Sequence, residues 1–220
     1  MPNASKAESA PERSYGGRTV SDRRAERRQR FWDAGIELFG TVGFAKTTVA
    51  DLCSATSLSR RQFYELYDNR EDLLLELYEH IQAVAREEVS TAVGAEMAKA
   101  TGGEVDLPAL AHAAMSAYMS AVATDSRWTR ISFTEVGGIG ERVEERRRVG
   151  RLVWAEFFIA TVTAVTDRER DELDYAATAF IGALTHVVFR WGTSDPRPPR
   201  DEIVDLLTHL LISLAFPPSD

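Results

Sequence analysis

Cysteine is nearly absent from the sequence: among its 220 residues, Cys53 stands alone. A single thiol can form neither an internal disulfide nor a thiolate zinc site, and this fits a reducing compartment. The four histidines, His80, His112, His186 and His209, lie far apart, without the spacing of metal ligands. We therefore expect no metal site.

Long apolar runs are also missing. Glu156 interrupts the stretch LVWAEFFIATVTAV, and the stretch AATAFIGALTHVVF has only fourteen residues, whereas a membrane-spanning helix needs about 20. Polar and small residues occupy the N-terminus, where a signal peptide would carry its apolar segment. These absences exclude a membrane protein and predict a cytoplasmic one.

Catalytic motifs are missing as well, since the sequence contains no HExxH, no GxSxG and no pair of cysteines. The segment GGIG at 137–140 resembles a phosphate-binding loop, but no strand precedes it and Val143 stands where a third glycine would be required. We expect a turn there, no cofactor and no enzymatic activity. A helical-bundle enzyme is the alternative, and the absence of a set of catalytic residues speaks against it.

Apolar residues recur at helical spacing through most of the chain, without an alternating strand pattern or an internal repeat. They make up 44% of the sequence, which is sufficient for a hydrophobic core. We predict an all-α fold. The expected helices cover 22–42, 49–56, 60–66, 69–94, 107–122, 126–136, 141–165, 168–191 and 200–216, with a loop over 97–106.

Charge is distributed unevenly along the chain. The net charge is −8, yet residues 1–74 carry 12 basic and 11 acidic side chains, so the excess of acid lies entirely in residues 75–220. Residues 13–30 hold seven arginines against Asp22 and Glu26. Such a local basic excess attracts phosphate groups whatever the total charge.

Two short helices in the N-terminal part begin with capping patterns, Thr48 followed by Asp51 and Ser59 followed by Gln62. A tight turn at Ser57 and Leu58 lies between the two helices. Two short helices joined in this way predict a helix-turn-helix, whose second helix enters the DNA major groove.

Arg60 and Arg61 stand at the start of this second helix. The guanidinium fork can donate two hydrogen bonds to guanine, each such pair giving about 1–3 kcal/mol of discrimination. Arg60 and Arg61 are therefore candidates for reading bases, with Gln62 as a third. The alternative is a solvated pair of surface arginines.

Two further side chains are candidates for phosphate contacts. Tyr64 offers a hydroxyl group, and Arg70 adds a cation at the N-terminus of the long helix, where backbone amides are free. As alternatives, Tyr64 packs in the domain and Arg70 pairs with Glu71 or Glu65 in solvent.

Together these residues resemble the DNA-binding domain of the TetR (tetracycline repressor) family of bacterial transcriptional regulators, over about residues 22–80. The combination consists of LF at 38–39, GF at 43–44, TTVADL at 47–52, Ser59, FY at 63–64 and REDLL at 70–74. The resemblance implies base contacts from Ser59, Arg60, Arg61 and Gln62. It also implies phosphate contacts from Thr47 or Thr48, Tyr64 and Arg70.

The chain departs from the family pattern at two positions. Ser57 replaces the usual glycine of the turn, so we expect an unfavourable backbone angle or a different turn there. Leu66 stands where a histidine often contacts phosphate, and we expect Tyr67 to substitute for it.

The last two helices are apolar on more than one side, which calls for two neighbours. They could form a four-helix interface across a two-fold axis, and the resemblance also implies a homodimer. A dimer would place its recognition helices roughly 34–36 Å apart on a palindromic operator. A monomer with its own helices on both faces is the alternative. The expected interface residues are Phe180, Leu184, Val188, Leu207, Leu210, Leu211 and Leu214.

The resemblance further implies an effector pocket between the middle helices, although aromatic and Met residues at helical spacing are usually core. Polar groups on apolar helices need partners, and a ligand could be one, while for His186 an ordinary core position is the alternative. The expected pocket residues are Met115, Tyr118, Phe133, Phe157, Thr161, Thr185 and His186.

From these observations we divide the chain into a disordered N-terminal arm (1–20), a helix-turn-helix domain (21–68), a connecting helix (69–94) and a ligand-binding and dimerisation domain (95–220). We expect a repressor that a small, mostly apolar effector releases from double-stranded DNA. The alternative is a helical protein that binds a small molecule without sequence-specific DNA binding.

Overall fold

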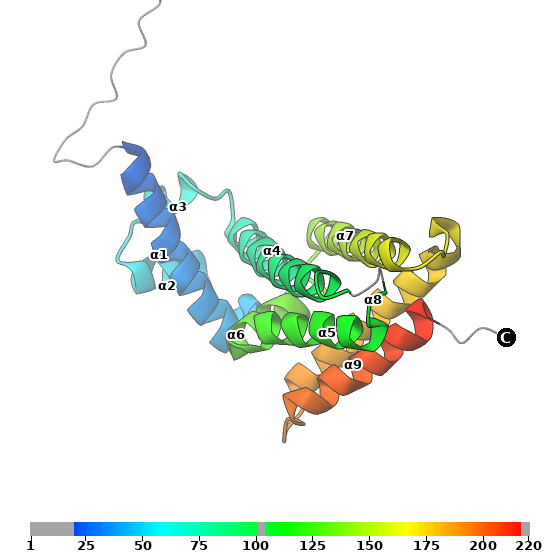
Figure 1. Cartoon of the computed structure of the whole chain (residues 1–220). Coiled ribbons are helices and arrows are strands. Elements are labelled where there is room, and N and C mark those ends of the chain that lie inside the picture. Colours follow the sequence, from blue (N-terminus) through cyan, green and yellow to red (C-terminus); the bar gives the residue numbers. More distant parts are fainter. Residues whose placement is uncertain (1–19, 101–103, 217–220) are drawn as a thin grey trace, which may run out of the picture.

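The computed structural model describes residues 20–100 and 104–216, and this part of the chain consists of helices joined by turns and loops, without an extended β-sheet (Figure 1). The all-α fold expected from the sequence is thus confirmed. The arm expected over 1–20 lies outside the described residues, apart from Val20, which begins the first helix. No helix in the described ranges is long and apolar enough to cross a bilayer.

The N-terminal part consists of one long helix and three short ones, each begun where a local signal stands in the sequence. Thr48 and Ser59 cap α2 and α3 with reciprocal capping boxes, as their spacing predicts. The bounds are α1 Val20–Thr41, the 3₁₀ turn η1 Phe44–Lys46, α2 Val49–Thr56 and α3 Arg60–Tyr64.

The long helix α4 (Arg70–Met97) begins at Asn69, whose side chain accepts a hydrogen bond from the amide of Asp72. The negative charges of Glu71 and Asp72 in its first turn interact favourably with the positive end of the helix dipole. In Figure 1, α4 leads from the α1–α3 unit to the C-terminal helices.

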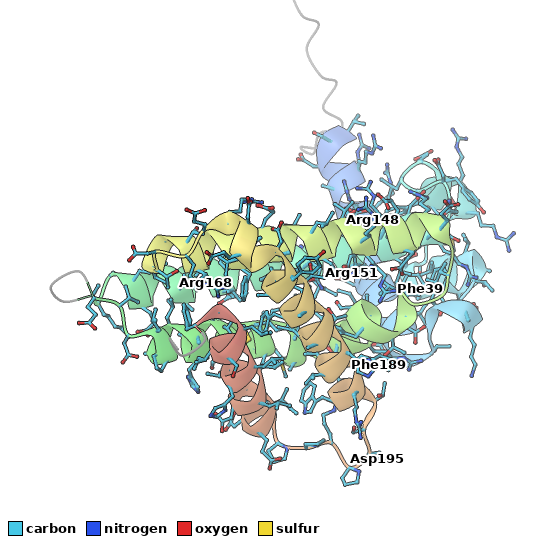
Figure 2. All side chains as sticks on the ribbon, turned by 90° about the vertical axis from the view of Figure 1, so that its right-hand side faces the viewer. Phe39, Arg148, Arg151, Arg168, Phe189 and Asp195 are labelled. Carbon is cyan, nitrogen blue, oxygen red and sulfur yellow. The ribbon has the colours of Figure 1, made fainter. Side chains whose placement is uncertain are left out.

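Six elements form the C-terminal part. Helices α5 and α7 flank α4, while α8 and α9 pack on each other and cross α7 and α5 respectively (Figures 1 and 2). The single helix expected over 126–136 is instead two pieces, a short α-helix followed by a π turn. The bounds are α5 Leu107–Ala123, α6 Ser126–Arg130, the π turn η2 Ile131–Glu135, α7 Glu141–Val165, α8 Arg170–Thr193 and α9 Arg200–Ala215.

Two hydrophobic clusters fill the molecule, and α4 contributes to both. Its first turns, including Leu73 and Leu77, pack against α1 in the N-terminal cluster, and its later turns, including Val89 and Val93, belong to the C-terminal cluster. The N-terminal cluster also contains three residues from the second half of the chain, Ile131, Val136 and Val143. The two parts therefore share packing beyond the boundaries expected from the sequence.

Helix α6 approaches the C-terminal end of α1 at a glycine. A Cβ atom built on Gly40 would lie 2.3 Å from the Cβ and 2.9 Å from the Cα of Arg127. These distances are too short for any side chain, so the absence of a Cβ at Gly40 is what lets the two helices touch.

We expect Gly40→Ala to lower the free energy of unfolding by about 1–3 kcal/mol, because the added methyl group forces backbone of α6 away from α1. Urea denaturation of the purified variant measures this change. The matched control is Gly94→Ala in α4, where a Cβ would meet nothing within 4 Å, and where we expect stabilisation by about 0.4–1 kcal/mol. Equal stability of both variants would contradict the packing described at Gly40.

Candidate nucleic-acid interface and ligand cavity

The turn between α2 and α3 requires a left-handed residue, and a serine occupies it. Ser57 has φ 53° and ψ 33°, and its amide donates to the carbonyl of Ser54 at 3.3 Å. The amide of Leu58 donates to the carbonyl of Cys53 at 3.1 Å and completes the end of α2. A side chain in this region costs roughly 1–2 kcal/mol, so of the two outcomes expected from the missing glycine, the unfavourable angle is the one present.

The first two residues of helix α3 are arginines, and both are exposed to solvent. Ser59 and Gln62 bond to each other, with the amide of Ser59 donating to Gln62 Oε1 at 2.9 Å, so both side chains serve the cap. Arg60 and Arg61 are exposed, and the Arg61 side chain, 89% accessible, makes only a 3.4 Å contact with Glu65. Base reading by these four residues stays a prediction, and the two arginines are the ones whose side chains are available for it.

Phe63 fixes the orientation of α3. Its side chain is fully buried, with its ring 5.2 Å from that of Phe31 in α1 and 5.4 Å from that of Tyr67. Tyr64, one position later, is 55% exposed and remains a candidate for a phosphate contact. The inward phenylalanine and outward tyrosine are what the sequence predicts for this helix.

The structure contradicts the phosphate contact expected from Tyr67. This tyrosine is buried between Phe31 and Phe63, and burial, together with the nearby carboxylate of Glu76, raises the pKa of its phenol well above the ordinary value. Tyr67 is a core residue, because the turn after α3 directs its ring back onto α1.

Of the two threonines expected at phosphate, Thr47 is buried and Thr48 is exposed. Thr47 Oγ1 donates to the carbonyl of Gly43 at 2.8 Å, so this hydroxyl is enclosed within the loop. Thr48 Oγ1 lies in the cap of α2, donating to Asp51 at 2.7 Å. Of this pair, only Thr48 stays a candidate.

Arg70 links backbone segments inside the domain. Its guanidinium donates to the carbonyl of Phe44 at 2.6 Å and to the carbonyl of Thr47, and it lies 4.3 Å over the Phe44 ring. Both hydrogen bonds use Nη1, so a phosphate contact from the rest of the guanidinium stays a prediction. The sequence gives no sign of this role, because the carbonyls lie more than twenty positions away in the chain.

The basic stretch of α1 is also partly neutralised within the domain. Arg28 pairs with Glu76, Arg27 lies 3.7 Å from Glu65, and Arg30 donates to the carbonyl of Thr56. The arginines that appear as a phosphate-attracting excess in the sequence thus tie α1 to α2, α3 and α4. Only part of their charge is left to attract DNA.

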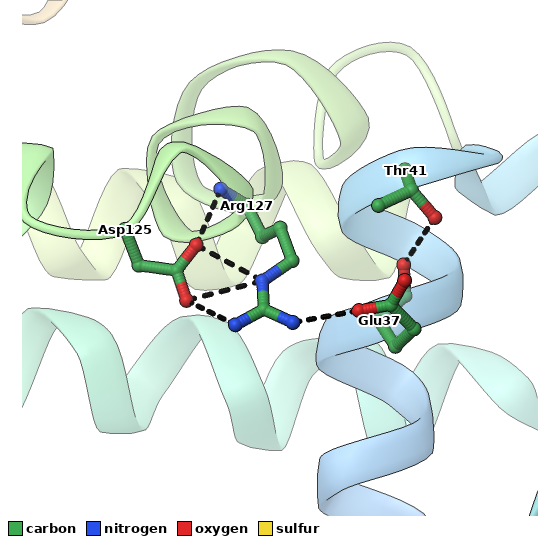
Figure 3. A network of polar contacts seen from close by, with 4 residues as sticks. All are labelled: Glu37, Thr41, Asp125 and Arg127. Carbon is green, nitrogen blue, oxygen red and sulfur yellow. Dashed lines mark hydrogen bonds and ion pairs between the residues drawn. The ribbon is translucent and has the colours of Figure 1, made fainter.

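A polar joint connects the end of α1 to α6, and sequence reasoning missed it. Arg127 donates to both oxygens of Asp125 and reaches Glu37 of α1 at 2.6 Å (Figure 3). These hydrogen bonds from Arg127 lower the pKa of the Asp125 carboxyl. Residues 37 and 127 are ninety positions apart, so no local pattern could have brought them together.

The joint continues through the π turn. Arg130 donates to the carbonyl of Thr41 at 2.6 Å and pairs with Glu135 at 2.7 Å. Glu135 in turn accepts a 2.7 Å hydrogen bond from the backbone amide of Phe44. Both ends of η2 are therefore bonded to the segment that leads into the helix-turn-helix.

The C-terminal helices enclose an apolar cavity of about 60 Å³. Four of the expected pocket residues line it, namely Met115, Tyr118, Phe157 and Thr161. Phe133 and Thr185 instead line an adjoining, more polar pocket of about 30 Å³.

His186 lines neither space. It lies exposed on the outer side of α8, with its ring 6.1 Å from that of Phe189. The expectation that it faces an effector is wrong, because the helical repeat turns it away from the neighbouring Thr185.

The expected interface residues are mostly internal. Phe180, Leu184, Val188, Leu207 and Leu211 are buried in the chain's own C-terminal core, while Leu210 and Leu214 are partly exposed. The sequence pattern could not tell an intramolecular partner from a second copy, since both cover an apolar face in the same way.

A different set of residues is exposed on these helices. We call it the α8–α9 face, consisting of Tyr175, Ala179, Gly182, His186 and Phe189 on α8 and Leu206 on α9. The α8 members follow each other at alternating intervals of four and three residues, which places them on one side of the helix. Figure 2 labels Phe189 toward the C-terminal end of this stripe.

Comparison with known proteins agrees with this architecture. Residues 32–77 match the family described as bacterial regulatory proteins, tetR family. No curated protein sequence matches the chain significantly.

Among solved structures, a putative TetR-family regulator from Syntrophomonas wolfei is 15% identical, with a TM-score of 0.68 over 87% of this chain and 95% of that one. FadR from Bacillus subtilis, solved with stearoyl-CoA, is 14% identical, with a TM-score of 0.68 over 84% and 97%. FadR from Thermus thermophilus, a TetR-family repressor solved with lauroyl-CoA, is 20% identical, with a TM-score of 0.61 over 88% and 97%. At this level of identity the likeness establishes the fold.

We expect Arg70→Gln to lower the free energy of unfolding by about 1–3 kcal/mol, because two backbone carbonyls lose a charged donor. Arg60→Gln is the control, since an exposed arginine should change stability by less than about 0.5 kcal/mol. Chemical denaturation of both variants makes the comparison. Full stability of Arg70→Gln would contradict the internal role described for this side chain.

Proposed function

On the premise that residues 32–77 are a tetR-family helix-turn-helix domain, we propose that the protein is a transcriptional repressor that binds a palindromic operator as a homodimer. The observation that supports this most directly is α3, which exposes Arg60 and Arg61 at its N-terminus while Phe63 fixes it to α1. Arginines in this position can reach guanine edges in the major groove.

The α8–α9 face is the proposed dimer interface. Tyr175 is 88% exposed and Leu206 52% exposed, whereas large apolar side chains of stable monomers are mostly covered. The small residues Ala179 and Gly182 at the centre of the stripe would allow close approach of a second α8. This set takes the place of the buried residues Phe180, Leu184, Val188, Leu207 and Leu211, while Leu210 and Leu214 stay candidates.

The proposed effector is a small, mostly apolar molecule that enters the C-terminal cavity. Ligand pockets usually measure about 300–1,000 Å³, so a cavity of about 60 Å³ must widen to admit one. The acyl-CoA ligands of the Bacillus subtilis and Thermus thermophilus FadR structures support the capacity of this fold to open around a long apolar chain.

Widening of the cavity would displace the helices that line it relative to the polar joint. Tyr118 of α5 and Phe133 of η2 line the two pockets, and η2 is bonded at both ends to the segment after α1. A ligand that binds the widened state more tightly then lowers the population of the DNA-binding state. Release of the operator follows from this differential affinity alone.

The first test is selection of duplexes from a random DNA pool by the full-length protein at 150 mM salt, a value on the order of physiological ionic strength. We expect enrichment of a palindrome whose half-sites are centred about 10 bp apart or a multiple of it. Arg60→Ala combined with Arg61→Ala should abolish the enrichment, while the matched exposed variant Arg148→Ala on α7 should retain it. A folded wild-type protein that enriches no sequence would favour a ligand-binding protein without DNA recognition.

Charge on the α8–α9 face should separate the dimer. We expect Phe189→Glu combined with Leu206→Glu to give a monomer by sedimentation velocity, because burial of unpaired carboxylates is costly. Val42→Glu, at an apolar side chain that is 46% exposed near the end of α1, is the control and should remain dimeric. A dimer that persists in the double variant would place the interface elsewhere.

A further inference from the structure

The polar pocket adjoins the apolar cavity, and we treat the two as neighbouring compartments. Tyr118, Trp154, Ile181 and Leu184 line both compartments. The larger compartment is apolar almost throughout its lining, with Thr161 as its main polar side chain, and the Thr161 hydroxyl already donates to the carbonyl of Phe157. A ligand that extends through both would therefore meet apolar surface at one end and polar groups at the other.

Two arginines of α7, Arg147 and Arg151, supply the charge of the polar compartment. Both pair with the same carboxylate, Glu144, at 2.5 Å and 2.8 Å. Arg86 of α4 adds a third cation close by, 6.0 Å from the Trp154 ring. The positive charge here exceeds the negative charge, and the Arg147 side chain is only 19% exposed.

Neutral groups in the same compartment can complete the recognition of an anion. Ser132 lines it with a buried hydroxyl that has no hydrogen-bond partner among the described residues. Such an orphaned group is costly unless something binds it. Gln82, which accepts a 2.9 Å hydrogen bond from Trp154 Nε1, also lines this compartment.

We propose that the effector is an amphiphilic anion, with an apolar chain in the cavity and a carboxylate or phosphate head against Arg147, Arg151 and Ser132. The head group competes with Glu144 for the two guanidinium groups. This inference rests on the proposed effector function and specifies its chemical class. The shared chemistry covers a free fatty acid and an acyl thioester that carries phosphates.

The test is isothermal titration calorimetry of the full-length protein with decanoate, decanoyl-CoA and uncharged decanol, each below its micelle concentration. We expect at least one anionic ligand to bind about tenfold or more tightly than decanol, as charge-assisted hydrogen bonds allow. Preference for decanoate or for decanoyl-CoA tells the two sources of the head group apart.

Variants then assign the preference to residues. Arg147→Gln combined with Arg151→Gln should remove the advantage of the anion and leave decanol binding unchanged. Arg148→Gln is the matched control, because Arg148 lies on the same helix, has a side chain that is 55% exposed and pairs with Glu145 rather than with Glu144. Glu144→Gln should tighten anion binding, since it frees both arginines, and it tests the inference even if the double variant does not fold.

The outcomes separate this inference from the proposed function. Equal binding of decanol and both anions, or an anion preference that survives the double arginine variant, would overturn the anionic class and leave an apolar effector. Absence of binding by all three ligands would overturn the effector itself, while the DNA selection stands as an independent test of operator binding.

Discussion

The continuity of α4 is the constraint on which the rest of the structure depends. The helix begins in the N-terminal core, where Leu73 and Leu77 are fully buried, and ends in the C-terminal core with Val89 and Val93. Each buried leucine of this kind contributes about 2–5 kcal/mol. Neither core can change its packing extensively without moving a helix that the other core also holds.

The contacts that join the two halves beside α4 are of a different kind. Arg127 with Glu37, and Arg130 with the carbonyl of Thr41, are partly exposed polar contacts, and such pairs are worth about 0–1 kcal/mol each. Allosteric coupling typically amounts to about 1–3 kcal/mol. The joint is therefore weak enough for a ligand to rearrange.

The sequence predicted the elements whose signals are local and failed where a contact joins distant segments. Capping residues located the starts of α2, α3 and α4, and the left-handed angle at Ser57 is one of the two outcomes expected from the family's usual glycine there. Tyr67 was assigned to DNA as a substitute for the family's histidine, and Arg70 from its place at the N-terminus of α4. The ring of Tyr67 is buried instead, and Nη1 of Arg70 bonds to two backbone carbonyls within the domain. On α8 the helical period identified an apolar helix correctly but could not tell which side its own chain covers.

The π turn η2 has a mechanical consequence. Its five residues, 131–135, form a wider helical loop than an α-helix uses, and such turns are frequent at functional sites. Conversion of a π turn into α geometry releases one residue, equivalent to about 1.5 Å of helical rise. Phe133 lines the polar pocket while Glu135 accepts a hydrogen bond from the amide of Phe44, so a change of this length in the π turn would move one of these two residues relative to the other.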